Sequence, residues 1–270
     1  MSDFFNLYSF DDYKKSFKGT NSAALTSCIQ EIVKRLELNN LLYLELNETN
    51  LTTEHVTSLV QGLKNNTSLR ILTLSYNPNL RDNDIINIVQ AVTSHKNLLG
   101  LDLSNIDFTN AVAEQISDFI RRNKTLLYLN ISHSKLNDQG IIPIAQALME
   151  NNSLLELELP GIYGFDNVMA NQHLIAAVQQ NQSLLFLSVG GRGISFEDIK
   201  AIKAKSISNL AGCKTAVKLP DNLFAYLQET RGFSWSIMQR DGRQVPLLDI
   251  LNQVDTNYKS LLPAPRIKLH

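Results

Sequence analysis

The stretch Leu126-Leu127-Tyr128-Leu129-Asn130-Ile131 shows the pattern that decides the fold of this 270-residue chain. Its apolar residues follow the order Leu-x-x-Leu-x-Leu, with isoleucine in the last place. The pattern recurs, with valine once in the last place, at Leu41-Leu44-Leu46, Leu69-Leu72-Leu74, Leu98-Leu101-Leu103, Leu154-Leu157-Leu159 and Leu184-Leu187-Val189. Successive first leucines are separated by 28, 29, 28, 28 and 30 residues. One such triplet would be weak evidence, but six in near-constant register predict a repeat protein.

Each repeat combines a short strand with a helix. Alternating apolar residues such as Leu44 and Leu46 share one face of a strand. The apolar spacing then becomes helical, as at Val56, Leu59 and Leu63. The six strands are expected to begin near Tyr43, Ile71, Gly100, Tyr128, Glu156 and Phe186. One strand and one helix cannot bury their own apolar faces, so the repeats must stack, with parallel strands inside and helices outside.

Polar residues at fixed places mark the turns between these elements. Four residues are predicted to be helix N-caps: Thr52, Asp82, Thr109 and Asn137. Ser195 and Asp198 resemble a capping box. Four asparagines stand three residues before a first leucine: Asn66, Asn123, Asn151 and Asn181. Because asparagine tolerates the left-handed conformation that ends a helix, we expect these residues to have a structural role.

The two ends of the chain differ from its middle. Residues 1–40 are predicted to form an N-terminal cap, with a helix near 22–36 covering the first repeat, because an open solenoid end exposes apolar core. The aromatic-rich residues 1–18 either pack onto this cap or form an exposed docking segment. Residues 41–205 hold about six repeats, and 206–270 are predicted to form a C-terminal cap of mixed structure. Leu210, Cys213 and Val217 in that cap fit a degenerate seventh strand.

Composition excludes several classes of function. The formal net charge of −1 gives no electrostatic reason to expect nucleic-acid binding. Residues 1–5 carry neither a basic flank nor an apolar run, so we expect no cleavable signal peptide, and no stretch has the length of a membrane span. Cys28 and Cys213 are far apart, which favours a reducing compartment, the cytoplasm, over a disulfide framework.

No catalytic or metal-binding pattern is present in the sequence. The histidines, which stand at different repeat positions without zinc-ligand spacing, are His55, His95, His133, His173 and His270. The run Gly190-Gly191-Arg192-Gly193 lacks the Lys-Ser/Thr of a phosphate-binding loop and reads as a glycine-rich turn. We therefore predict a protein that is not an enzyme and that holds no metal or cofactor. Catalysis by the C-terminal cap is the competing hypothesis.

In period and leucine register, residues 41–205 resemble the ribonuclease-inhibitor type of leucine-rich repeat. The likeness implies an α/β solenoid that binds another protein and, by analogy with ribonuclease inhibitor, inhibits or regulates an enzyme. The chain departs from the family at the position where an asparagine satisfies the turn backbone. That position reads Thr49, Asn77, Ile106, Ser134, Ile162 and Arg192. We expect Thr49 and Ser134 to replace the asparagine partly, and the isoleucines not to replace it.

Two weaker likenesses suggest more specific roles. The asparagine-rich, irregular style is similar to leucine-rich-repeat effectors that intracellular bacterial pathogens deliver into the host cytosol, without a cleavable signal peptide. One class of GTPase-activating protein also uses this repeat type, so regulation of a small GTPase is the alternative function. No residue of this sequence singles out either role.

The inner face of the predicted sheet carries a single sign of charge. Its columns contain four carboxylates, which belong to Glu45, Asp102, Glu156 and Glu158, and no Lys or Arg. The same columns hold three aromatic residues, which are Tyr43, Tyr128 and Phe186. Inner columns can be polar simply because they face water, but this combination favours a binding site for a partner protein with a basic surface patch.

The inner strip alone is too small for a protein interface. Six strands spaced about 4.8 Å apart make a strip about 24 Å long and about 10 Å wide. A standard interface covers about 800 Å² per partner, so the strand-to-helix loops must contribute. The candidates for anchoring contacts in those loops are Tyr76, His133, Tyr163 and Phe165.

Overall fold

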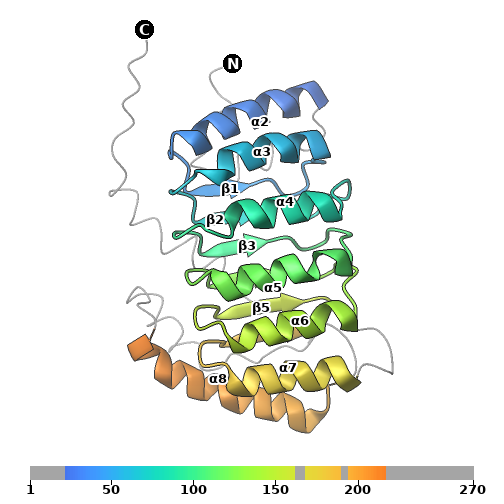
Figure 1. Cartoon of the computed structure of the whole chain (residues 1–270), viewed down its shortest axis with the longest axis vertical. Coiled ribbons are helices and arrows are strands. Elements are labelled where there is room, and N and C mark those ends of the chain that lie inside the picture. The colour runs from blue at the N-terminus through green and yellow to red at the C-terminus, as the bar shows by residue number, and fades with distance from the viewer. Residues whose placement is uncertain (1–21, 162–167, 190–193, 217–270) are drawn as a thin grey trace.

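The computed structural model of the chain describes residues 22–161, 168–189 and 194–216. Six strands form one sheet, and helices cover one of its faces in a regular stack (Figure 1). The strands are β1 (Tyr43–Glu45), β2 (Ile71–Thr73), β3 (Gly100–Asp102), β4 (Tyr128–Asn130), β5 (Glu156–Leu159) and β6 (Phe186–Val189). The helices are α2 (Ser22–Glu37), α3 (Thr53–Lys64), α4 (Asp82–Val92), the short 3-10 helix η2 (Asn110–Val112), α5 (Ala113–Arg122), α6 (Asp138–Met149), α7 (Val168–Gln180) and α8 (Phe196–Ala216).

The strands pair in sequence order, and every pair is parallel. Their register places one residue of each strand in a single row: Tyr43, Ile71, Gly100, Tyr128, Glu156 and Phe186. These are the six residues at which strands were predicted to begin. The α/β leucine-rich-repeat solenoid expected from the sequence is confirmed.

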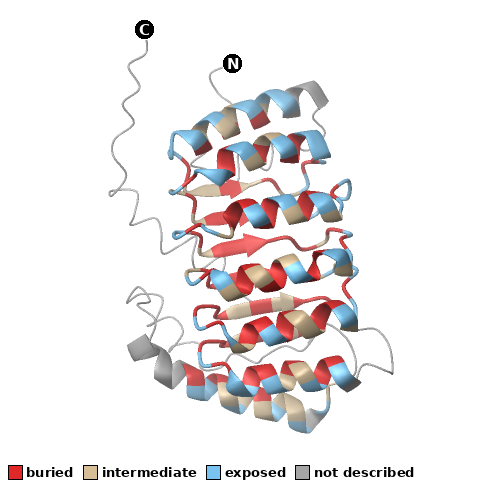
Figure 2. Ribbon diagram, in the orientation of Figure 1, coloured by how far each residue is buried: buried red, intermediate tan, exposed pale blue. Residues whose placement is uncertain are grey.

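The core lies between the sheet and the helices. Leu101, Leu129 and Leu157 are each 0% exposed in the row where the middle strands face the helices. The matching helix faces are buried too, as at Ile116 on α5 and Ile144 on α6. Figure 2 shows buried residues along the strands and the inner sides of the helices, and exposed residues on their outer sides. The repeats therefore share one continuous core, as stacking requires.

Helix α2 closes the N-terminal end of this core, as predicted. Ile29, Ile32 and Leu36 on α2 are almost fully buried. Gly62 on α3 makes the close approach of the two helices possible, because a Cβ there would lie 3.1 Å from the Cβ of Leu36 and 3.2 Å from the carbonyl oxygen of Val33. The predicted packing of residues 1–18 lies outside the described residues.

The four turn asparagines form a ladder between repeats, so the structural role expected of them is confirmed. None of them has a positive φ, and Asn123 has φ −77° and ψ 124°. Each buried side chain uses Nδ2 to donate to a carbonyl of the preceding repeat, as Asn66 does to Leu36 at 2.7 Å. Each Oδ1 accepts two backbone N–H groups of its own turn. The asparagines thus satisfy buried backbone groups that would otherwise lack partners.

His95 stands in this ladder where the other repeats have asparagine. It lies 29 residues after Asn66 and 28 before Asn123, at a repeat position that the other described histidines do not share. Its Nε2 lies 2.7 Å from the carbonyl oxygen of Leu63, which assigns the proton to Nε2. Its Nδ1 is buried and has no hydrogen-bond partner. Burial lowers the pKa of the imidazole, an effect that the bond to Leu63 partly opposes.

Acidification is therefore expected to weaken the fold. The unfolded chain binds a proton on His95 near the ordinary pKa of about 6.5, whereas the folded chain binds it only at lower pH. Stability present above pH 6.5 should thus be lost as the pH falls below it, by at most about 1.4 kcal/mol per pH unit. Urea unfolding between pH 7.5 and 5 should show a shallower decline for His95→Asn.

Two other histidines bear on this measurement. Burial also lowers the pKa of His55, so part of the decline should remain in the His95→Asn variant. His173 lies on α7, outside the ladder, and its Nδ1 lies 2.8 Å from the carbonyl oxygen of Met169. His173→Asn serves as the matched control and should keep the wild-type decline. An unchanged decline in His95→Asn would contradict the assigned role.

Caps and turns agree in most places with the sequence-based expectations. Thr52 and Asn137 are N-caps of α3 and α6, and Thr109 caps η2. Asp82 is instead the first residue of α4, and its carboxylate accepts the backbone N–H of Thr109 at 2.6 Å. Ser195 Oγ accepts the backbone N–H of Asp198 at the start of α8, as in a capping box, and the hydroxyl donates to Asp198 Oδ2.

The turn position at which the family has asparagine is satisfied in three ways. Asn77 donates to the carbonyls of Leu46 and Leu74 and accepts the N–H of Leu51. Thr49 and Ser134 donate their hydroxyls to a carbonyl three residues earlier, so the predicted partial replacement is confirmed. Ile106 is 0% exposed and joins the core instead. The two remaining positions, Ile162 and Arg192, lie outside the described residues.

At the C-terminal end, α8 covers the last repeat. It runs without a break through residue 205, the boundary expected between repeats and cap, and Ile202 faces the core. The seventh strand predicted at Leu210 and Cys213 is wrong, because both residues belong to α8. Asn209 continues the ladder by donating to the carbonyls of Asn181 and Leu184. Among the helices that the structure describes, none combines the length and apolar character required to cross a membrane.

Candidate protein-binding face

The inner face of the sheet is the face that the helices leave uncovered. Because side chains alternate along a strand, the residues flanking each core leucine point to this face. The register brings Glu45, Thr73, Asp102, Asn130 and Glu158 into one row across five strands. We call this set the polar row.

A hydrogen-bonded group links β4 to β5 within this face. The hydroxyl of Tyr128 donates to Glu158 Oε1 at 2.9 Å and accepts from Asn130 Nδ2 at 3.1 Å. Asn130 Oδ1 accepts the backbone N–H of Ser132 at 2.9 Å. Tyr128 is only 2% exposed. Its ring is therefore a support that positions Glu158, rather than a surface aromatic residue.

The polar row continues towards β1 with carboxylates tied to the following turns. Asp102 Oδ1 accepts the N–H of Ser104 at 2.8 Å. Glu45 Oε1 accepts from Asn47 Nδ2 at 3.0 Å, and Asn47 Oδ1 accepts the N–H of Ser75 at 2.8 Å. Both carboxylates are thus held in place by neighbouring polar groups.

Thr73 lies between these two carboxylates in the polar row. Its side chain is 4% exposed, and its hydroxyl has no hydrogen-bond partner. Buried polar groups are normally paired, because an unpaired one loses its hydration without compensation. The sequence alone did not single out Thr73, because the partner of a hydroxyl cannot be read from spacing.

The acidic groups of this face interact through their charges. Burial, and then the negative charge of Glu45, raises the pKa of Asp102. Burial and the charge of Asp102 raise the pKa of Glu158, against the bond from Tyr128. The pKa of Tyr128 is raised by burial and by the charges of Glu158, Asp102 and Glu156. Burial is thus the main cause of each raised pKa, and the neighbouring carboxylates of the face add to it.

The predicted site residues separate into three groups. Those of the inner columns lie together on the sheet: Asp102 and Tyr128 are buried, while Tyr43, Glu45, Glu156, Glu158 and Phe186 are half-buried. Tyr76 and His133 lie on the turns after β2 and β4, two repeats apart, and Tyr76 is 54% exposed. Tyr163 and Phe165 lie outside the described residues, and their role stays a prediction.

Tyr76 and His133 belong to a row of left-handed turn residues that the sequence analysis did not identify. Glu48, Tyr76, Asn105 and His133 recur at the same repeat position, with φ between 55° and 57°. The backbone N–H of each of the first three donates to a serine carbonyl of the next repeat. Gly161 stands at the same position one repeat later, and that glycine was the available signal.

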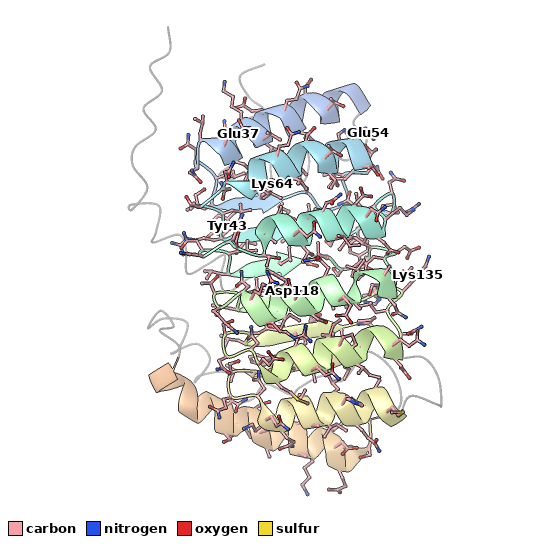
Figure 3. The ribbon with its side chains drawn as sticks, in the orientation of Figure 1. Glu37, Tyr43, Glu54, Lys64, Asp118 and Lys135 are labelled. Atoms are coloured by element: carbon pink, nitrogen blue, oxygen red, sulfur yellow. The ribbon has the colours of Figure 1, made fainter. Side chains whose placement is uncertain are left out.

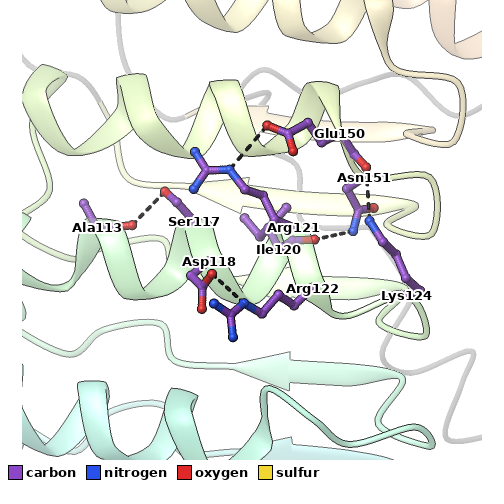
Figure 4. Close-up of polar contacts among 9 residues, drawn as sticks. All are labelled: Ala113, Ser117, Asp118, Ile120, Arg121, Arg122, Lys124, Glu150 and Asn151. Atoms are coloured by element: carbon purple, nitrogen blue, oxygen red, sulfur yellow. Dashed lines mark hydrogen bonds and ion pairs between the residues drawn. The ribbon is translucent and has the colours of Figure 1, made fainter.

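The helical face carries charges of both signs, and its arginines are paired. Arg121 Nε lies 3.4 Å from Glu150 Oε1, and Arg122 Nε lies 2.8 Å from Asp118 Oδ1 (Figure 4). Lys124 Nζ donates to the backbone carbonyl of Glu150. Figure 3 shows further charged side chains of helices and turns, among them Lys135 at an edge of the stack. The uniform negative sign is thus a property of the inner face.

Metal binding finds no support in the described part of the chain. Within residues 22–161, 168–189 and 194–216, no group of three or more His, Cys, Asp or Glu side chains is placed to hold a metal ion. Cys28 is a free, half-buried thiol whose pKa is raised by burial.

Comparisons with known proteins point to the same architecture. No family model matches the chain. Human leiomodin-3 is 24% identical over 128 residues, which cover 47% of this chain and 23% of that protein. Mouse NACHT, LRR and PYD domains-containing protein 4B is 41% identical over 59 residues, 22% of this chain and 7% of that protein. The chain thus spans less than a quarter of the length of these relatives.

A solved structure agrees with these likenesses at the level of the fold. The structure titled "Leiomodin-1 Actin-Binding Site 2 (ABS2)" matches 75% of this chain and 95% of its own, with a TM-score of 0.50 and 18% identity. At 18% identity, this match is evidence for a shared fold only. The repeat register, the parallel sheet and these likenesses together show that the chain has the leucine-rich-repeat fold.

Proposed function

We propose that this chain is a binding module without catalytic activity, which holds a partner protein on the inner face of its sheet. The observation that carries the proposal is the charge of that face, where four carboxylates stand without a Lys or Arg in the same columns. Burial raises the pKa values of Asp102 and Glu158, and the charge of a neighbouring carboxylate raises each of them further. A partner with a basic surface patch would complement the negative charge of this face.

The acidic and the aromatic residues of the inner face would contribute to binding in different ways. Glu156 and Glu158 attract the partner, because complementary charge mainly raises the association rate. Tyr43, Phe186 and the exposed Tyr76 offer aromatic area for the contact itself, since aromatic anchors dominate interface energies. Tyr128 acts through Glu158, because its own ring is buried and its hydroxyl is bonded to that carboxylate.

Charge reversal on the inner face is expected to weaken binding at least about tenfold. The variant Glu156→Lys/Glu158→Lys should associate more slowly with a partner captured by the full chain, and the salt dependence should flatten or reverse. Surface plasmon resonance at two salt concentrations measures both effects. Because Glu158 contacts Tyr128, circular dichroism must confirm folding, and Glu156→Gln provides a milder variant.

The matched control reverses charge on the helical face. Arg121→Glu/Arg122→Glu changes the same number of charges on α5 and should leave the affinity within about twofold. If the helical variant abolishes binding while the inner-face variant binds as the wild type does, the interface lies on the helices or the caps.

The proposal extends to what binding does to the activity of the partner. By likeness to ribonuclease inhibitor, we propose that binding inhibits or regulates an enzyme. Acceleration of GTP turnover by the added chain would support the alternative role at a small GTPase. Monomeric actin should also be tested as a candidate partner, because the solved structure that resembles this chain is titled as an actin-binding site.

We also propose the cellular compartment in which the chain acts. The free thiol of Cys28 is compatible with a reducing compartment, and we propose the cytoplasm. The asparagine-rich style supports a further possibility, delivery into a host cell as a bacterial effector. Detection of the chain in the cytosolic fraction of infected host cells would test delivery.

A further inference from the structure

We propose that His55 is the centre of a pH-sensitive clasp between α2 and α3, and that protonation of its imidazole releases α2 from the stack. The clasp consists of Thr52 and His55 at the start of α3 and Thr26 on α2. It lies at the N-terminal end of the solenoid, where α2 runs along α3 (Figure 1). Because the clasp needs no partner, the inference goes beyond the proposed function and does not depend on it.

Histidine here fills a capping position whose side chain must accept a hydrogen bond. His55 is the third residue of α3, after the N-cap Thr52. Its Nδ1 accepts the backbone N–H of Thr52 at 3.2 Å, so Nδ1 carries no proton. Glutamate or glutamine accepts this bond in the usual capping box, and neither gains a proton in mild acid. Histidine does, near pH 6.5, so mild acid can break this capping box.

The other ring nitrogen joins α3 to α2. Because Nδ1 is an acceptor, the proton of the neutral imidazole lies on Nε2. Nε2 lies 3.3 Å from Oγ1 of Thr26 and donates to it. The ring is buried at 5% exposure, although the two preceding residues of α3 are exposed. One buried side chain thus bonds to the N-cap backbone of α3 and to a hydroxyl of α2.

Protonation of His55 conflicts with this arrangement. A proton on Nδ1 would face the N–H of Thr52, so that two donors would meet. The positive charge would also lie at the N-terminus of α3, where the helix dipole disfavours a cation. Burial lowers the pKa of His55, which the charge of Glu54 partly opposes. The clasp therefore contributes stability above the ordinary pKa of about 6.5 and loses it as the pH falls below that value.

The charged groups of the three neighbouring helices leave this conclusion unchanged. On α3 itself, the exposed Glu54 precedes His55, and its charge does not outweigh the effect of burial on the pKa. On α4, the carboxylate of Asp84 already accepts two hydrogen bonds. On α2, Glu31 is paired with Arg35 at 3.1 Å.

The remaining contacts of α2 do not titrate and lie nearer its C-terminus. Ile29, Ile32 and Leu36 are buried against the core, and the carbonyl oxygen of Leu36 accepts from Asn66 Nδ2. Loss of the clasp therefore frees the N-terminal turns of α2 first. A helix of 16 residues is only marginally stable in water by itself, so the freed turns should unfold and exchange their amide hydrogens.

Hydrogen exchange of the full chain, followed by mass spectrometry, measures this opening. The readout is the protection of the α2 amides after correction for the intrinsic exchange rate at each pH. Between pH 7.5 and 5, this protection should fall between about threefold and about 30-fold. The upper limit arises because pH 5 lies about 1.5 units below the ordinary pKa of histidine. At both pH values α2 should exchange faster than α6, since the opening is local.

The variant His55→Gln tests the assignment to one residue. Glutamine can accept the capping bond and does not titrate, so the protection of α2 should change less than twofold between the two pH values. The matched control is His173→Gln on α7, which should keep the wild-type fall. The same fall in His55→Gln as in the wild type, or equal exchange of α2 and α6, would overturn the proposal.

Cys28 on α2 provides a second measurement that keeps His55 in place. Its thiol is half-buried and packs against the core. In the variant Cys213→Ser it is the only thiol of the chain. Its rate of reaction with 4,4′-dithiodipyridine, divided by the rate of the urea-unfolded chain at the same pH, should rise at least twofold from pH 7.5 to 5. An unchanged ratio would contradict release of α2.

Discussion

Replacing Asn151 with alanine should lower the free energy of unfolding by about 3–5 kcal/mol, because four buried backbone groups lose their partner at once. The side chain is 1% exposed. Its Nδ2 donates to the carbonyls of Ile120 and Asn123, at 2.7 and 3.1 Å. Its Oδ1 accepts the N–H groups of Ser153 and Leu154, at 2.9 and 2.8 Å. Urea unfolding followed by circular dichroism measures the loss.

The neighbouring Asn152 provides the matched control for this substitution. It is the same residue type one position later and is exposed. Asn152→Ala should change the free energy of unfolding by less than about 0.5 kcal/mol. Equal stability of the two alanine variants would show that the asparagine ladder does not join the repeats.

The second large effect is expected at the centre of the core. Leu129 is 0% exposed and pairs with Leu101 and Leu157 on the adjacent strands. Leu129→Ala should cost about 2–5 kcal/mol through lost burial and the cavity left behind. The same unfolding assay applies. Leu38→Ala is the control, because Leu38 is 58% exposed and should cost far less.

The arrangement of strands was predictable because one residue type repeats at one spacing. A leucine that must face the core in every repeat fixes both the strand position and its register. That is why the row of Leu101, Leu129 and Leu157 agrees with the sequence pattern. The capping helix α2 followed from the same reasoning, since an apolar end of the stack needs cover.

The asparagine ladder shows what spacing could not reveal. The position of the asparagines was evident, but their side chains bond to the preceding repeat, about 30 residues earlier in sequence. A local argument about helix ends therefore indicated a structural role for these residues but not the contacts between repeats. His95 was missed for the same reason, although its place three residues before Leu98 was visible in the sequence.

The candidate site was predictable in composition but not in packing. The alternation of each strand assigned Glu158, Tyr128 and Thr73 to one face. Burial depends on the neighbouring strands, and so do the bond from Tyr128 to Glu158 and the unpartnered hydroxyl of Thr73. The seventh strand failed because the helical run of α8 continues through Leu210 and Cys213, whose spacing also fits a strand.

The most direct test of the inner-face hypothesis is zero-length carbodiimide cross-linking of the chain to its bound partner, mapped by mass spectrometry. Both faces offer carboxylates, with Glu45, Glu156 and Glu158 on the sheet, Glu114 and Asp118 on α5, and Glu150 at the C-cap of α6. The account predicts that cross-links to lysines of the partner arise from the sheet residues. Cross-links confined to the helical carboxylates would contradict it.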